Sequence, residues 1–369
     1  MEYTLSNVTP ELVIGDLRMN PPIIQGGMGV RVSGPSLASA VSNTGALGVI
    51  ASVGLCTEAP YISMDYETGC ANALRDIIRN TRLRTSNPIG VNIMCVLSNY
   101  NDLVRVADDE EVEAIISGAG LPLRLPSLVK NDRTRLVPIV SSARAASLIC
   151  RTWLKRYHRL PDAIVVEGWR AGGHLGFNWE EIESRATSSL ETIVTEVLGV
   201  TADYRAPNGS PIPVIAAGGI FDGADIARFL RLGASGVQMG SRFVCTHECD
   251  AAWPYKEAYL SCKEEDIVVI RSPVGLPARV IKNRFVERLV AGEKVNFGCP
   301  YHCLTPCDPR ASSYCIAQAL VNAYRGNLDE GYAMCGSNAW RINKVVSVGD
   351  LIEELRSGCA CAFGRLGAD

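Results

Sequence analysis

The sequence PVIAAGGI at residues 213–220 and the sequence GVQMGSR at residues 236–242 share one pattern, a short apolar run that ends in a glycine turn. Continuous apolar runs of this length are typical of strands that are buried on both faces of a parallel sheet. In a (β/α)8 barrel, the turns after strands seven and eight usually bind phosphate through backbone N–H groups. These two stretches therefore favour a barrel and predict a phosphate site at its mouth.

Six further apolar runs precede these two, so the sequence predicts eight strands. Segments with apolar residues three and four apart lie between the strands and predict helices at residues 34–43, 71–81, 143–157 and 222–232. Strands that alternate with helices form parallel βαβ units, and eight such units match a (β/α)8, or TIM, barrel. A doubly wound sheet is the alternative, but it is weakened by the number of strands and by glycine turns that follow the last two. The predicted strands are residues 23–25, 47–50, 89–92, 114–117, 136–140, 163–166, 213–216 and 236–239.

The pattern changes after about residue 250. Proline- and cysteine-containing loops now join segments that predict helices, at residues 251–262, 278–291, 315–325 and 348–356. We therefore expect a barrel over residues 1–250 and a mainly helical C-terminal extension, or cap, over residues 251–369.

The composition excludes several classes of protein. The chain of 369 residues is 47% hydrophobic and 20% charged, which excludes disorder as the main state. A net charge of −3 gives no sign of a nucleic-acid partner or a polybasic membrane anchor. No apolar stretch is long enough to span a membrane, and residues 1–20 do not resemble a signal peptide. We therefore expect a cytoplasmic protein, whose 14 cysteines are mostly packed thiols.

One histidine stands where an active site is expected. His174 lies in the sequence GWRAGGHLG at residues 168–176, just after the sixth predicted strand. Active sites of these barrels lie at the carboxyl ends of the strands, and a histidine there suits proton transfer near neutral pH. The alternative is a structural histidine that is bonded to a loop carbonyl. Asn92 and Glu167 end the third and sixth strands and could bind ligand hydroxyl or phosphate groups.

Six motifs occur in order: PIIQGGMG at residues 22–29, AVS and GALG at 40–48, GVN at 90–92, AGGHLG at 171–176, IAAGGI at 215–220, and GVQMGSRF at 236–243. Together they resemble the nitronate monooxygenase family and the related flavin-type enoyl-acyl-carrier-protein reductases. The resemblance covers about residues 20–250. It implies an FMN-binding barrel in which His174 is catalytic. It also implies that the cofactor contacts Gln25, Gly26, Gly27, Met28, Asn92, Glu167, Gly172, Gly173, Gly218, Gly219, Gly240 and Ser241.

Two reactions of a small-molecule substrate are implied by the resemblance. The first hypothesis is oxidation of alkyl nitronates by O2 to a carbonyl compound and nitrite. The second is reduction of an enoyl thioester, with NAD(P)H as co-substrate. Both use the same residues, so the motifs do not separate them. A flavin-free barrel that binds a sugar phosphate is a third hypothesis, which the phosphate site permits. The oligomeric state is not readable from these motifs.

A cysteine cluster lies outside the barrel motifs. Cys299, Cys303, Cys307 and Cys315 fall within 17 residues, in a C-x3-C-x3-C-x7-C spacing. Such thiols could ligate zinc or an iron–sulfur cluster. They could equally be packing or redox thiols, since the spacing is not the C-x2-C of ferredoxins or zinc ribbons.

Overall fold

Eight short parallel strands form one sheet, in the order β3-β11-β10-β8-β7-β6-β5-β4. A parallel bridge between Ile24 and Leu47 joins the two ends of this order and closes the sheet into a barrel. The computed structural model describes residues 10–206, 209–299 and 301–364. The predicted (β/α)8 fold is confirmed, with strands β3 (Ile23–Gln25), β4 (Gly48–Ala51), β5 (Ile89–Met94), β6 (Ala114–Gly118), β7 (Arg135–Val140), β8 (Ile164–Glu167), β10 (Val214–Ala217) and β11 (Gly236–Met239).

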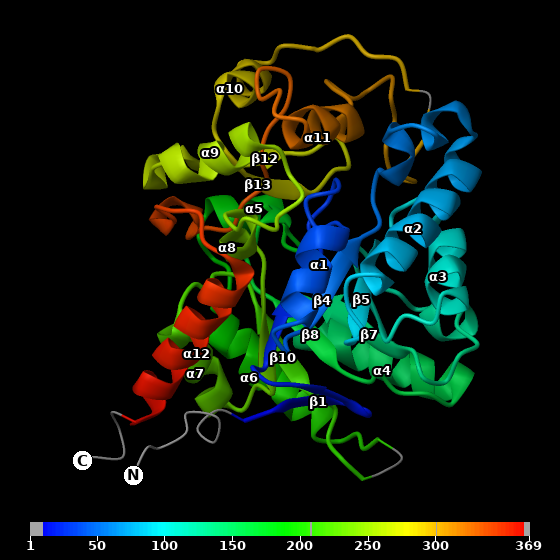
Figure 1. The fold of residues 1–369 in the computed structure, drawn as a ribbon, viewed down its shortest axis with the longest axis vertical. Helices are drawn as coiled ribbons and strands as arrows, with labels where there is room; N and C mark the ends of the chain where they lie inside the picture. Colours follow the sequence, from blue (N-terminus) through cyan, green and yellow to red (C-terminus); the bar gives the residue numbers. More distant parts are fainter. Residues whose placement is uncertain (1–9, 207–208, 300, 365–369) are drawn as a thin grey trace.

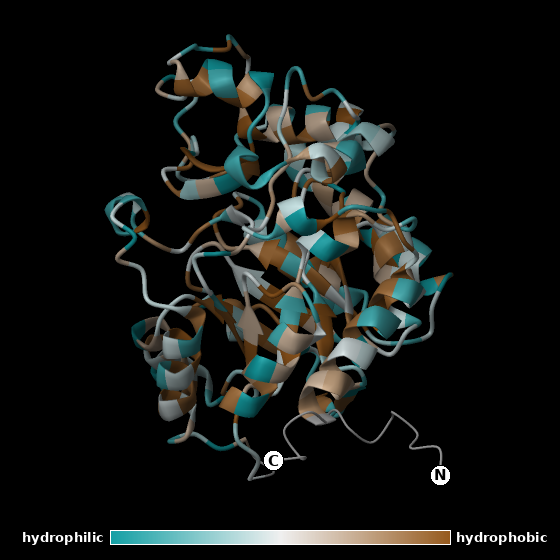
Figure 2. Cartoon of the chain, turned by 90° about the vertical axis from the view of Figure 1, so that its left-hand side faces the viewer, coloured by the Kyte–Doolittle hydropathy of each residue, from teal (hydrophilic) through white to brown (hydrophobic). Residues whose placement is uncertain are grey.

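The strands are apolar because the barrel buries both of their faces. Figure 2 shows the strands as mostly hydrophobic and the surrounding helices as mixed in hydropathy. Side chains such as Ile24, Val137 and Ile215 form an interior cluster, and each is fully buried. The outward-facing side chains pack against α1 (Pro35–Ser42), α2 (Tyr66–Arg82), α3 (Tyr100–Asp109), α4 (Ala143–Tyr157), α6 (Leu190–Thr201) and α7 (Gly223–Leu232).

A hairpin that the sequence did not reveal covers the amino-terminal end of the barrel. Strand β1 (Leu12–Ile14) pairs antiparallel with β2 (Leu17–Met19), and both lie at the bottom of Figure 1. Leu12, Ile14 and Met19 are almost fully buried and belong to the interior cluster. The hairpin therefore closes one end of the barrel, and the opposite end, where the strands finish, remains for the site.

The last helix of the chain completes the outer ring of helices. After β11 the chain makes only a four-residue helix, α8 (Ser241–Val244), while α12 (Val348–Gly364) packs between α7 and α1 (Figure 1). The packing is tight, because a Cβ on Gly223 would lie 2.2 Å from the backbone nitrogen of Cys359. The division into residues 1–250 and 251–369 stays a prediction, but α12 covers the barrel that the first segment builds.

The rest of the extension lies over the carboxyl ends of the strands, at the top of Figure 1. The predicted helix at residues 278–291 is wrong in its first half, because Pro277–Ile281 forms strand β13. This strand pairs on one edge with β12 (Ile267–Arg271) and on the other with the two-residue β9 (Gly173–His174), and this pairing overrides the helical pattern. The other elements are α5 (Trp179–Glu183), α9 (Trp253–Ser261), α10 (Arg284–Val290), α11 (Ile316–Tyr324) and the single-turn 3-10 helices at Leu55–Thr57, Tyr61–Ser63, Leu125–Ser127, Glu264–Asp266 and Ala339–Arg341.

Two properties of the described residues relate to the expectations about membrane spans and cysteines. None of their helices combines the length and the apolar character that crossing a membrane requires. All 14 cysteines lie among them as unpaired thiols.

Substitution of Gly48 tests how tightly the outer helices pack on the barrel. A Cβ there would lie 1.9 Å from the backbone oxygen of Ala38 in α1, so Gly48→Ala must push the helix away from β4. We expect a loss of about 2 kcal/mol or more in the free energy of unfolding, measured by urea denaturation. Gly199→Ala is the matched control, because Gly199 is exposed in α6 with no atom near its would-be Cβ. It should stabilise the protein by about 0.5–1 kcal/mol. An equal effect of both substitutions would contradict this account of the packing.

Candidate active site

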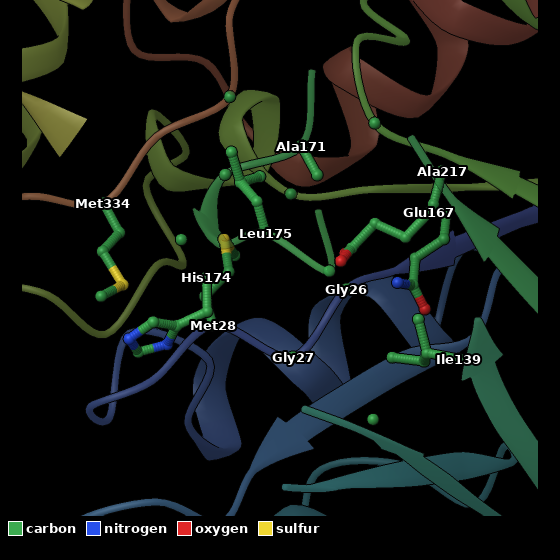
Figure 3. A pocket seen from close by; sticks show the side chains of 18 of the residues that line it. Gly26, Gly27, Met28, Ile139, Glu167, Ala171, His174, Leu175, Ala217 and Met334 are labelled. Atoms are coloured by element: carbon green, nitrogen blue, oxygen red, sulfur yellow. The ribbon is translucent and has the colours of Figure 1, made fainter. Parts of the chain in front are cut away.

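A cavity of about 460 Å³ opens where the barrel strands end and the extension covers them. Ligand pockets in proteins typically have volumes of about 300–1,000 Å³. Figure 3 shows its lining, with Gly26 to Met28, Glu167 and His174 around one space. The structure brings together all but one of the residues predicted to contact a cofactor or substrate: Gly26, Gly27, Met28, Asn92, Glu167, Gly172, Gly173, His174, Gly218, Gly219, Gly240 and Ser241.

Gln25 is the exception. Its side chain is completely buried and is not part of the cavity lining. The Nε2 atom donates to Ser33 Oγ at 2.9 Å, and Oε1 accepts from the backbone N–H of Val49 at 3.0 Å. Gln25 therefore joins β3 to β4 inside the wall of the barrel, and its side chain has no contact to offer a ligand in the cavity.

The glycine turns bring the backbone itself to the cavity. A Cβ on Gly27 would lie 2.4 Å from the Cβ of Asn92, so only glycine lets the turn after β3 approach β5. Gly218 and Gly219 both have left-handed backbones, with φ of +95° and +84°. Glycine tolerates this conformation, so the backbone can turn tightly here, and turns can present their N–H groups to an anion. The geometry after β10 therefore suits a phosphate group.

Glu167 ends β8 and points into the cavity beside the turn after β3 (Figure 3). Burial raises the pKa of this carboxyl group to about 7. None of the ion pairs of the described residues involves Glu167, so no basic side chain opposes this effect. At neutral pH the carboxyl group can thus either accept or donate a hydrogen bond.

His174 lies on the opposite side of the cavity, near Met334 (Figure 3). Its backbone is held in β9, where it pairs with Ala278 of β13. Burial lowers the pKa of the imidazole to about 4, so the ring is neutral at physiological pH. Its Nε2 lies 2.9 Å from the hydroxyl oxygen of Ser272. The sequence motif thus located the histidine, but not its hydrogen-bond partner.

The extension contributes residues that no motif indicated. Residues 334–338 line the cavity beside the glycine turns. The N–H of Gly336 donates to Ser241 Oγ at 2.8 Å, and Asn338 Nδ2 donates to the carbonyl of Gly219 at 2.7 Å. Their signal in the sequence is weak, since the five residues Met-Cys-Gly-Ser-Asn are too few to show a periodicity. Other lining residues that sequence reasoning missed include Gln238, Tyr255, Tyr259, Leu276 and Leu320.

Buried polar atoms that have no hydrogen-bond partner indicate whether this cavity fits the flavin that the family resemblance implies. Gln238 and Ser337 line the cavity, and the Oε1 atom of Gln238 and the Oγ atom of Ser337 are buried without a hydrogen-bond partner. Buried polar atoms without partners are rare, and they are explained when a ligand supplies the missing bond. Polar groups that lack partners, next to left-handed glycine turns, fit a polar, phosphate-bearing group such as FMN.

None of the four clustered cysteines lines this cavity. Cys299, Cys303, Cys307 and Cys315 are half-buried. The carbonyl of Cys303 accepts the N–H of Ser98, which ties the segment to the loop after β5. Within residues 10–206, 209–299 and 301–364, no three or more Cys, His, Asp or Glu side chains are arranged to hold a metal ion. A zinc or iron–sulfur site at these thiols stays a prediction.

Comparison with known proteins extends the resemblance beyond the barrel motifs. The family model of nitronate monooxygenase matches residues 11–110 and 97–358. A (3aS,4S,5R,7aS)-5-hydroxy-7a-methyl-1-oxo-octahydro-1H-indene-4-carboxyl-CoA dehydrogenase of Mycobacterium tuberculosis is 31% identical over 273 residues, which cover 74% of this chain and 66% of that protein. This chain thus spans slightly less than two thirds of that relative. A probable nitronate monooxygenase of Staphylococcus aureus is 28% identical over 308 residues, covering 74% and 78% of the two chains.

Among solved structures, FabK from Thermotoga maritima superposes with a TM-score of 0.73 and 30% sequence identity. The match covers 94% of each chain, so it includes the C-terminal extension as well as the barrel.

The raised pKa of Glu167 predicts how stability depends on pH. Because folding raises this pKa, the folded state favours the protonated carboxyl group, and stability is lost as the pH rises through about 7. Glu167→Gln stays neutral and avoids this loss. We expect the variant to gain about 2 kcal/mol over the parent protein between pH 4 and pH 8, allowing for solvent in the cavity. Urea denaturation of both proteins without added ligand measures it.

Glu183→Gln is the matched control, because Glu183 is an exposed glutamate on α5, outside the cavity. A pH-dependent gain of equal size in both variants would contradict the assignment to Glu167.

Proposed function

The chain belongs to the nitronate monooxygenase family, and from this premise and the geometry of its cavity we propose that it is an oxidoreductase that uses FMN. A bound flavin would supply hydride or single-electron transfer, while the protein binds and orients it. The N–H groups around Gly218, Gly219 and Gly240, with the Ser241 hydroxyl, would hold its phosphate. Asn92 and Glu167 would bind its hydroxyl-bearing chain, and the turn at residues 26–28 would lie against its ring.

The charge state of the site favours a neutral substrate. His174 is neutral, and the other basic side chain among the described residues that line the cavity, Arg242, is already paired. Arg242 donates to Glu354 at 2.8 Å and to the carbonyl of Phe221 at 3.0 Å. An anion would therefore find no free positive charge, whereas a carbonyl oxygen needs only one hydrogen-bond donor. The choice of substrate class rests on these contacts of Arg242, which leave it no free charge.

We therefore propose that the substrate is an acyl thioester and that the reaction is reduction of an enoyl group, with NAD(P)H as co-substrate. Apolar side chains from several elements line the cavity and would surround an acyl chain while excluding water: Met94, Leu121, Leu276, Leu320 and Met334. His174 would donate a hydrogen bond to the thioester oxygen, where negative charge accumulates during reduction. The relative in Mycobacterium tuberculosis whose name describes a CoA thioester supports this class of substrate.

Oxidation of alkyl nitronates to a carbonyl compound and nitrite, with O2, is the second candidate. The family match and the relative named as a probable nitronate monooxygenase favour it. A neutral His174 can donate a hydrogen bond to a nitronate oxygen as well as to a carbonyl. The lack of a free cation in the lining counts against it, because the negative charge of the nitronate would be buried without a partner.

Anaerobic mixing separates the two candidates. The purified protein should carry a flavin, visible in its absorbance spectrum. NAD(P)H should bleach this absorbance rapidly, and an enoyl-CoA should then restore it in the absence of oxygen. Bleaching by an alkyl nitronate alone, with no response to NAD(P)H, would overturn the thioester proposal in favour of the second candidate. A protein that binds no flavin would overturn both.

Removal of the imidazole tests the role of His174. We expect His174→Ala to retain bound flavin but to lose at least about 100-fold in kcat, because the hydrogen bond to the developing charge is gone. His247→Ala is the control, since His247 is exposed and outside the cavity lining. Steady-state kinetics and the flavin-to-protein ratio are measured for both variants. Undiminished turnover of His174→Ala would reject the assignment.

A further inference from the structure

Ser272 is the hydrogen-bond partner of the histidine that lines the cavity. It follows β12 at the start of the turn to β13, and it is only 5% exposed. Its hydroxyl oxygen is 2.9 Å from Nε2 of His174. Ser272 itself does not line the cavity. Ser272 can therefore act on a ligand only through the imidazole of His174. Its effect depends on which atom, Nε2 or the hydroxyl oxygen, donates in the hydrogen bond between the two residues.

The turn fixes the position of the Ser272 hydroxyl. The N–H of Ser272 donates to the carbonyl of Leu276 at 3.0 Å, and the carbonyl of Ser272 accepts from Gly275 at 2.9 Å. The N–H of Val274 points at the hydroxyl oxygen from 3.4 Å and occupies one of its lone pairs. A hydroxyl group has two lone pairs and one hydrogen, so the hydrogen must find an acceptor of its own.

Nε2 of His174 is the acceptor that this geometry offers. Among the residues that the structure describes, Ser272 Oγ has no hydrogen-bond partner besides Val274 and His174. If Nε2 carried the proton, the hydroxyl hydrogen would be buried without an acceptor, and an unmade buried hydrogen bond is costly. If the hydroxyl donates to Nε2, both groups are satisfied. A neutral imidazole has one N–H, and it must then sit on Nδ1.

Nδ1 is free for a ligand. No hydrogen bond within the described part of the chain involves this atom, and it is not among the buried atoms that lack a partner. His174 itself lines the cavity, next to Met334 (Figure 3).

We propose that Ser272 is a positioning residue that holds His174 in the Nδ1–H tautomer, so that the histidine offers the substrate a hydrogen-bond donor and not a base.

The Nδ1–H tautomer limits what His174 can do in the reaction. A donor at Nδ1 can stabilise negative charge on a substrate oxygen, but it cannot remove a proton from carbon. The tautomer itself does not depend on which substrate is used, whereas its value in catalysis rests on the proposed function. Under the second candidate, the same tautomer would restrict the enzyme to nitronates and exclude neutral nitroalkanes, which must first lose a carbon-bound proton.

The tautomer is directly measurable. The holoenzyme is labelled with 15N-histidine, and long-range 1H–15N correlation spectra are recorded at pH 7. Only four histidines are present, and His174→Gln identifies the signals of His174. We expect the 15N shift of a protonated nitrogen for Nδ1 and that of an unprotonated nitrogen for Nε2. The reverse pattern, or an even mixture, would overturn the proposal.

Two variants of Ser272 separate positioning from a structural role. In Ser272→Ala we expect the Nε2–H tautomer to appear in the spectra and kcat to fall about tenfold, while flavin content and melting temperature stay close to the parent values. Ser272→Thr keeps the hydroxyl and should restore both the Nδ1–H signal and the rate. If Ser272→Ala leaves the tautomer unchanged, Ser272 does not set it.

The test of the His174 tautomer and the test of thioester reduction can fail independently of each other. An Nδ1–H tautomer in an enzyme that does not reduce thioesters would refute the proposed function and leave the role of Ser272 intact. Thioester reduction by an enzyme whose His174 carries its proton on Nε2 would do the opposite.

Discussion

The closure of the parallel sheet is the constraint on which the other features of this protein depend. The bridge between Ile24 and Leu47 removes the last open edge, and the Gln25 side chain reinforces it by accepting the N–H of Val49. Because the eight strands are parallel, all of them end at the same rim of the closed sheet. Side chains and turns that are far apart in the sequence, such as Met28, Glu167 and Gly218, are thereby brought around one cavity.

A barrel closed in this way leaves its mouth open, and the chain after residue 250 covers it. Strand β13 pairs with β9 and so holds His174 from the outside of the barrel. Residues 334–338 join the glycine turns through the bonds of Gly336 to Ser241 and of Asn338 to Gly219. The extension is therefore part of the site as well as a cover.

The electrostatic character of the site follows from this covering. Glu167 and His174 lie in the cavity that the extension covers. Burial raises the pKa of Glu167 and lowers that of His174, and both shifts favour the neutral form. Arg242 could have supplied positive charge, but Glu354 of α12 neutralises it. The site thus combines hydrogen-bond donors and acceptors with very little net charge. Beside His174, such a site polarises a neutral substrate group better than it captures a charged one, while the glycine turns suit a phosphate.

Local patterns in the sequence were enough to predict the strands, most of the helices and nearly all of the residues that were expected at the cavity. Buried strands and glycine turns can be predicted in this way because each leaves its signal within a few neighbouring residues. The exceptions have a common cause. Gln25 belongs to a motif, but its hydrogen bonds to β4 keep it in the wall. Residues 277–281 carry a helical pattern, but two neighbouring strands make them β13. Ser272 has no pattern at all and gains its importance from a bond to a residue 98 positions away. Only the tertiary structure decided these features, because each depends on contacts between segments that are distant in the chain.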